Sequence, residues 1–176
     1  PFGLSFPELN LRTYVKGPNG PGVYFYNLDA DDRLGVAIAR RLFALPYYRA
    51  AMEVTRSGRT EGCNPNTDAV RFTSRRTHTG IPAARFDATY EPAGESFTAD
   101  PGSLDEFLVE NYRFYADGNR LYCGEIRHEP WRLREVDVDV RANTLFDANG
   151  FDHPEGMPLV RYAEPIDVSA DRIRRV

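Results

Sequence analysis

The sequence has very little lysine and cysteine. Of its 22 basic residues only Lys16 is a lysine, and Schiff-base catalysis needs a lysine amine. Lys16 begins a turn-like segment, Lys16–Gly20, which makes it a poor candidate for that role. Cys63 and Cys123 form no CxxC pair and have no nearby histidine at metal-ligand spacing. This favours two reduced thiols over a single disulfide.

The sequence also lacks the motifs of several common classes of enzyme and binding protein. The three histidines lie in distant segments, and there is no GxGxxG loop, P-loop, GxSxG elbow or HExxH helix. We therefore expect neither a cofactor nor a metal. A net charge of -4 argues against a nucleic-acid partner. No apolar run reaches the length of a membrane helix, and no signal-peptide pattern is present, so we expect no membrane partner and a cytoplasmic location.

Short β-prone runs separated by turn formers dominate the 176 residues. We expect strands at Leu9–Val15, Gly22–Leu28, Ala51–Ser57, Ala69–Arg76, Ala84–Tyr90, Arg120–His128, Glu135–Val140 and Leu159–Ala163. Their close spacing favours an antiparallel sheet or barrel over a βαβ repeat. The length fits one domain spanning residues 1–176. The fold class is therefore mainly β (α+β).

Two helices are expected to interrupt the strands. The first covers about Asp31–Leu45, with apolar residues at helical spacing and Pro46 as its stop. The second opens with the capping-box spacing of Ser103–Glu106 and continues until Gly118 ends it. The arginines near the C-terminus are expected to lie in a frayed, solvated end.

The first candidate site lies where the first helix stops. Pro46 is followed by Tyr47 and Tyr48 just before a strand, and a position fixed by proline is well suited to aiming a side chain into a cavity. The alternative, of equal weight, is that one tyrosine packs in the core and the other lies at the surface.

The second candidate is the segment Tyr122–Trp131. On a strand, Tyr122 and His128 share one face while Glu125 lies on the other. Together with Trp131 they offer an imidazole, a carboxylate and an aromatic wall for a ligand. The structural alternative is that His128 and Trp131 close one end of a barrel.

Two further strands carry charges on one face. Alternation puts Glu8 and Arg12 together, where they would bind or protonate a ligand if that face points into a barrel. If the face points to solvent, they form an ordinary surface pair. Arg71 and Arg75 pose the same question, because their guanidinium groups suit a carboxylate.

Four segments together resemble a known family: Phe6–Tyr14, Gly22–Phe25, Leu45–Tyr48 and Leu121–Trp131. They are similar to the YqjF-like family of uncharacterised conserved proteins, and the match runs along nearly the whole chain. The resemblance implies an acetoacetate decarboxylase-like fold, a β-barrel or cone with two peripheral helices.

The resemblance also implies where an active site would lie. Acetoacetate decarboxylases end a similar helix with Pro-Lys-Lys, and the matching residues here are Pro46, Tyr47 and Tyr48. Glu8 matches an active-site carboxylate. The family's arginine and second glutamate would lie upstream of this chain, so we expect its N-terminal strands to be missing or its barrel to be incomplete. Phenols form no imine, so ordinary acetoacetate decarboxylation is not expected.

Three hypotheses follow for the function. The first is lyase-like or proton-transfer chemistry on an oxo-acid, with Glu8, Tyr47 and Tyr48 as catalytic residues. Ligand contacts would come from Arg12, Arg71, Tyr122, Glu125, His128 and Trp131. The second is a non-catalytic module that binds an oxo-acid or aromatic ligand, and the third is a filled barrel without a pocket. The sequence leaves the oligomeric state open, homo-oligomers included.

Overall fold

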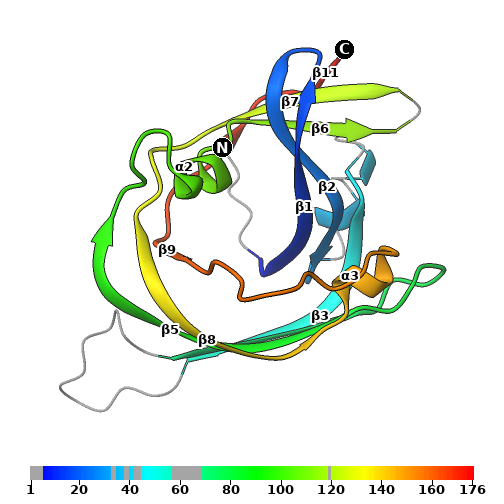
Figure 1. Cartoon of the computed structure of the whole chain (residues 1–176). Helices are drawn as coiled ribbons and strands as arrows, with labels where there is room; N and C mark the ends of the chain where they lie inside the picture. The colour runs from blue at the N-terminus through cyan, green and yellow to red at the C-terminus, as the bar shows by residue number, and fades with distance from the viewer. Residues whose placement is uncertain (1–5, 33–34, 38–39, 42–44, 57–68, 119) are drawn as a thin grey trace.

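A computed structural model describes residues 6–32, 35–37, 40–41, 45–56, 69–118 and 120–176 (Figure 1). The strands are β1 (Glu8–Gly17), β2 (Gly20–Ala30), β3 (Tyr47–Arg56), β4 (Val70–Arg76), β5 (Arg85–Phe97), β6 (Arg113–Asp117), β7 (Leu121–Arg127), β8 (Leu133–Asn143), β9 (Tyr162–Ala163), β10 (Ser169–Ala170) and β11 (Arg174–Arg175). The named helices are α2 (Leu104–Val109) and α3 (Leu145–Ala148). The predominance of strands confirms the mainly β fold class.

All the strands belong to one sheet, which follows the order β10-β7-β6-β2-β3-β4-β5-β8-β9. Figure 1 shows this sheet curving round into an open ring. β1 pairs along the whole of β2, whose other edge is shared between β6 and β3. The pairings of β2 with β3 and β6 are parallel, and the other ladders are antiparallel. Strand β2 is therefore the branch point of the sheet.

Tyr115 anchors the β1–β2 hairpin to β6. Its hydroxyl donates to the carbonyl of Gly20 at 2.8 Å and accepts from the amide of Asn19. A Cβ added at Gly17 would lie 2.2 Å from the Tyr115 ring. Gly124 of β7 leaves room in the same way for the ring of Phe114. Both glycines therefore serve close packing within the protein.

The inner side of the curved sheet is partly covered by the C-terminal part of the chain. The segment between α3 and β9 crosses the inside of the ring in Figure 1. Its last residues and β9 together make up residues 159–163. They share a cavity of about 540 Å³ with Phe72, Tyr90 and Val138. Val138 and Val54 remain 38% and 44% exposed, so this side of the sheet is not completely filled.

The expected second helix is shorter than the sequence indicates. Its start is correct: the side chain of Ser103 accepts from the amide of Glu106 and caps α2. It ends after Val109, where Asn111 donates its side-chain amide to the carbonyls of Phe107 and Leu108. The expectation that this helix runs to Gly118 was wrong, because the last residues form β6.

The remaining expectations have mixed outcomes. Residues 35–37 and 40–41 are helical, and the rest of the expected helix Asp31–Leu45 lies mainly outside the described residues. The C-terminal arginines are not frayed, because Arg174 and Arg175 pair with Cys123 and Tyr122 of β7. Cys123 is buried and free, whereas Cys63 lies outside the described residues. Within the described ranges, no helix is both long and apolar enough to span a membrane.

Candidate functional site

The end of β2 brings Glu8 and Tyr47 together. Glu8 of β1 pairs with Ala30 on one edge of β2, and Tyr47 of β3 pairs with Leu28 on the other. The phenol of Tyr47 donates a hydrogen bond of 2.8 Å to Oε2 of Glu8. The side-chain amide of Asn10 donates to Oε1 of Glu8 at 3.3 Å. Two residues from distant parts of the sequence thus form one hydrogen-bonded pair.

Pro46 fixes the position of Tyr47 in this pair. Its carbonyl accepts from the amide of Leu28 at 3.0 Å, and the Tyr47 amide donates to the carbonyl of Leu45 at 2.8 Å. Arg40 adds a bond of 2.7 Å from Nη1 to the carbonyl of Tyr47. The turn at Pro46 is therefore tied both to β2 and to the preceding segment.

The surroundings of the pair increase the proton affinity of both groups. Burial raises the pKa of Glu8 above its usual value, and the hydrogen bonds from Tyr47 and Asn10 only partly oppose this. Burial and the neighbouring charge of Glu8 raise the pKa of Tyr47. Tyr47 is therefore a phenol that stays protonated, beside a carboxyl group with increased proton affinity.

Tyr48 lies on the opposite face of β3, because successive strand residues alternate. Its ring is 4.9 Å from the guanidinium carbon of Arg76 and 5.4 Å from that of Arg40. The ring of His78 meets it edge-on at 5.4 Å. Tyr47 and Tyr48 therefore belong to two different surroundings.

A buried ion pair lies next to Tyr48. Arg76 Nε donates to Asp29 Oδ1 at 2.8 Å, and the two side chains are only 2% and 1% exposed. Burial raises the pKa of Asp29, and Arg76 opposes the shift. Arg76 Nη2 and Asp29 Oδ2 have no hydrogen-bond partner within the described part of the chain. Unpartnered buried groups are unusual and need a structural or functional explanation.

Tyr48 also lines a cavity of about 500 Å³. Tyr24 and Tyr26 of β2, Arg40 and Asp117 contribute to the same cavity. Burial raises the pKa of Tyr24, and so do the neighbouring acidic groups, led by Asp117. The lining combines aromatic rings, phenol donors, a guanidinium group and the carboxylate of Asp117, which are groups that can orient a small planar ligand.

The arginines predicted to bind a ligand contact other partners. Arg12 Nη2 donates to the carbonyl of Leu108 at 2.9 Å and so joins β1 to α2. Arg71 binds Asp87 of β5, with Nη2 at 3.1 Å from Oδ2. Neither contact is to Glu8 or Tyr47.

The segment Tyr122–Trp131 forms a separate surface. The ring of His128 stacks on Tyr112 at 4.6 Å and lies 5.0 Å from Trp131. Glu125 binds Arg113 at 3.3 Å, and Glu125 and His128 line a common cavity of about 580 Å³ with Tyr112. Tyr122 pairs with Ala116 of β6 and Arg175 of β11. The residues predicted to bind a ligand therefore do not form a single site around Glu8 and Tyr47.

Sequence reasoning did not identify Asp29 or Arg76. A signal for Arg76 was present, because alternation along β4 places it on the same face as Val70 and Ser74, both of which are buried. An arginine on the buried face of a strand requires a partner. That partner, Asp29, comes from β2, and the parallel pairing of β2 with β3 was not expected.

Comparison with solved structures identifies the fold. The enduracididine biosynthesis enzyme MppR, in a complex with pyruvate, is 14% identical with a TM-score of 0.55, covering 96% of this chain and 64% of that chain. Another MppR structure, with the condensation product of pyruvate and imidazole 4-carboxaldehyde, has a TM-score of 0.52 at 14% identity, covering 82% and 56%. The fold is the acetoacetate decarboxylase-like type, as the sequence resemblance implied.

Sequence comparison identifies the family. The uncharacterized protein YqjF of Bacillus subtilis (strain 168) is 43% identical over 169 residues, which cover 96% of this chain. The chain spans 65% of the length of that relative. The DUF2071 family, described as "Uncharacterized conserved protein", matches residues 1–167. The chain therefore belongs to this family of uncharacterised, YqjF-like proteins.

Proposed function

We propose that the protein transfers a proton at the carbon next to the carbonyl of a small oxo-acid, without a Schiff base. The observation that carries this proposal is the 2.8 Å hydrogen bond between Tyr47 and Glu8. Tyr47 can donate a hydrogen bond to a carbonyl oxygen, and Glu8 beside it can accept a proton from carbon. Both side chains are partly exposed to solvent.

The two groups divide the chemistry between them. The oxo-acid carbonyl replaces Glu8 as the acceptor of the Tyr47 hydrogen bond, which frees the carboxylate. Glu8 then takes the proton from the adjacent carbon, and Tyr47 stabilises the enolate oxygen. The proton on Glu8 exchanges with solvent, and transfer of a solvent-derived proton (a deuteron in D2O) from Glu8 to the enolate carbon completes the cycle. The raised pKa of Tyr47 keeps its proton in place throughout.

Arg12 is the proposed partner of the ligand carboxylate. It lies on β1 with Glu8, and one of its nitrogen atoms is fixed by the carbonyl of Leu108. Arg71 suits this role less well, because its Nε and Nη2 both bond to Asp87. The oxo-acid class is supported by the MppR structure, whose description names pyruvate as its ligand.

The exchange of methyl protons of pyruvate for deuterium, followed by NMR, tests the proposal. We expect the wild-type protein to catalyse exchange and Tyr47→Phe to reduce the rate about 10²–10³-fold, as loss of an oxyanion donor does. Glu8→Gln removes the base and should reduce it at least as much. Tyr90→Phe is the matched control, because it removes a phenol of β5 that belongs to neither the Glu8–Tyr47 pair nor the Tyr48 cavity. Wild-type exchange that survives both site substitutions unchanged would contradict the proposal.

The Tyr48 cavity supports a second candidate function, binding without turnover. The observation behind it is that Nη2 of Arg76 has no hydrogen-bond partner among the described residues. The guanidinium group of Arg76 packs against the ring of Tyr48, which lines the cavity. Calorimetric titration with pyruvate and benzoate separates the two functions. Binding that is lost in Tyr48→Ala, retained in Tyr47→Phe and unaccompanied by exchange would favour the binding module.

A further inference from the structure

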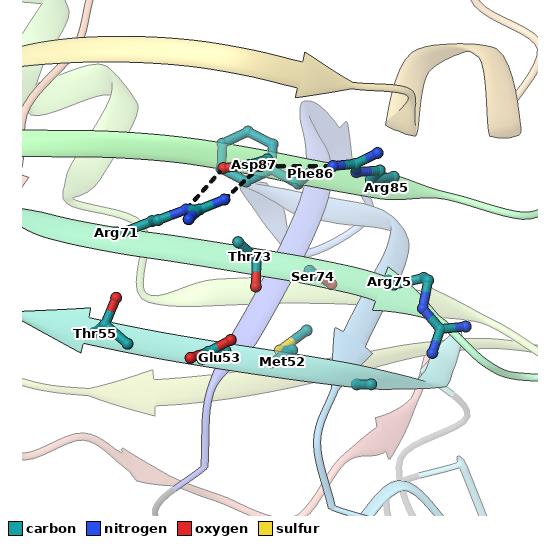
Figure 2. A pocket seen from close by; sticks show the side chains of 11 residues that line it. Met52, Glu53, Thr55, Arg71, Thr73, Ser74, Arg75, Arg85, Phe86 and Asp87 are labelled. Carbon is teal, nitrogen blue, oxygen red and sulfur yellow. Dashed lines mark hydrogen bonds and ion pairs between the residues drawn. The ribbon is translucent and has the colours of Figure 1, made fainter.

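A second polar cavity lies on the face of the β3–β4–β5 sheet that carries Arg71 and Arg75. It measures about 480 Å³, within the range of small-molecule sites. Figure 2 shows it as a groove across three neighbouring strands. Its lining includes Thr55, Arg71, Thr73, Arg75, Arg85 and Asp87. Neither Glu8 nor Tyr47 belongs to this set.

Asp87 holds several arginines in place along this groove. Arg71 donates to it through Nε and Nη2, and Arg141 of β8 donates through the same two atoms. Arg85 Nη2 lies 3.6 Å from Oδ2 of Asp87. The hydrogen bonds from Arg71 and Arg141 lower the pKa of Asp87 to about 2, so it stays ionised. Arg141 also bonds to Asp139 at 2.9 Å, whereas Arg71 and Arg85 share Asp87 as their one ion-pair partner among the described residues.

Arg75 adds a further positive charge to the groove. It lies directly opposite Arg85 in the β4–β5 register, and its other cross-strand neighbour is Ala51. Like charges in directly opposite positions destabilise a sheet. Within the described residues Arg75 forms no ion pair. Glu53 lines the same groove and forms no ion pair among the described residues.

We propose that this groove binds a small anion carrying two or more negative charges, of phosphate or polycarboxylate chemistry. Arg75 and Arg85 would bind the anion through their planar guanidinium groups, which match both oxoanion types. Asp87 acts as a positioning residue, because it fixes Arg71 and Arg85 before the ligand arrives. The hydroxyls of Thr55 and Thr73 provide further donors. An anion between Arg75 and Arg85 would remove the repulsion between them.

The charge pattern favours a small molecule over a nucleic acid. The chain as a whole carries a net charge of -4, whereas nucleic-acid surfaces present an extended basic footprint. Here three arginines and two carboxylates line one groove. The site is independent of the proton-transfer proposal, because its lining includes neither Glu8 nor Tyr47.

Calorimetric titration with pyrophosphate and with citrate tests the groove. We expect at least one to bind, and the preferred probe distinguishes phosphate from polycarboxylate recognition. Arg75→Gln and Arg85→Gln should each weaken binding about tenfold or more, and affinity should fall with added salt. Arg172→Gln makes the same charge change at an exposed position and should leave binding unchanged. Absence of binding by both probes, or equal weakening in all three variants, would overturn the proposal.

The melting temperature of the unliganded protein provides a second readout. Because Arg75 faces a like charge, Arg75→Gln should leave the melting temperature unchanged or raise it, while abolishing the increase caused by the bound anion. If Arg75 has only a structural role, both the melting temperature and anion binding should respond in the opposite way. Its substitution would lower the melting temperature and leave anion binding intact, which would also overturn the proposal.

Discussion

At the scale of single residues, Glu8 and Tyr47 influence each other's proton affinity. The hydrogen bond from Tyr47 lowers the pKa of Glu8, whereas burial raises it by more. The charge of Glu8 in turn raises the pKa of Tyr47. The pair is thus arranged so that the phenol keeps its proton while the carboxylate is a stronger base than an exposed glutamate.

This coupling predicts the pH dependence of exchange. Glu8 must be ionised to act as a base, so the rate should rise through an apparent pKa above 4.5, the usual glutamate value. In Tyr47→Phe the lowering hydrogen bond is lost, so the residual rate should rise at still higher pH. Carboxyl NMR titration of both proteins measures the same shift directly. An ordinary or lowered pKa of Glu8 would contradict this prediction.

The buried Asp29–Arg76 pair predicts a large effect on stability. Arg76→Met leaves the carboxylate of Asp29 buried without its partner, which typically costs about 3–5 kcal/mol. Urea unfolding should record that loss. The double variant with Asp29→Leu removes both charges and should recover much of it. A loss below about 1 kcal/mol in Arg76→Met would mean that the pair contributes little.

At the scale of elements, the start of helix α2 could be predicted from the sequence, whereas its end could not. The capping residues of Ser103–Glu106 act locally, so the start of the helix was predictable. Its end depends on β6, whose Phe114 and Tyr115 pack against glycines of β7 and β1. Those partners are set by tertiary packing, which overrides local helical periodicity.

The N-cap of α2 predicts a measurable change in the free energy of unfolding. Ser103→Ala removes the acceptor for the Glu106 amide and should lower the free energy of unfolding by about 1 kcal/mol. Thr98→Ala, at an exposed loop position, is the control and should change it by less than about 0.5 kcal/mol. Equal stability of the two variants would show that the cap is not needed.

At the scale of the whole molecule, β2 explains how the site is assembled and how far it could be foreseen. Alternation in β1 and the stop at Pro46 were visible in the sequence, and family resemblance related Glu8 to Tyr47. The residues proposed to join them, Arg71 and Glu125, lie with Asp87 and Arg113 instead. The positions of Arg71 and Glu125 depend on the order of the strands, above all on the edge of β2 that β3 and β6 share. No local sequence pattern encodes that strand order.

The overall arrangement also predicts the outcome of imine trapping. The only lysine, Lys16, is exposed and lies near the β1–β2 turn, whereas Glu8 lies at the other end of β1. Borohydride reduction in the presence of pyruvate should therefore leave no covalent adduct, as mass spectrometry would record. A reduced adduct on Lys16 would show that the protein uses imine chemistry after all.

The central claim is that Glu8 and Tyr47 act as one catalytic pair. It is tested most directly by the pyruvate exchange rates of four proteins: wild type, Glu8→Gln, Tyr47→Phe and the double variant. If the residues act together, the double variant should lose about as much as the more damaging single substitution, because effects within one catalytic unit are not additive. Losses that multiply fully, or an unchanged rate in every variant, would contradict the account.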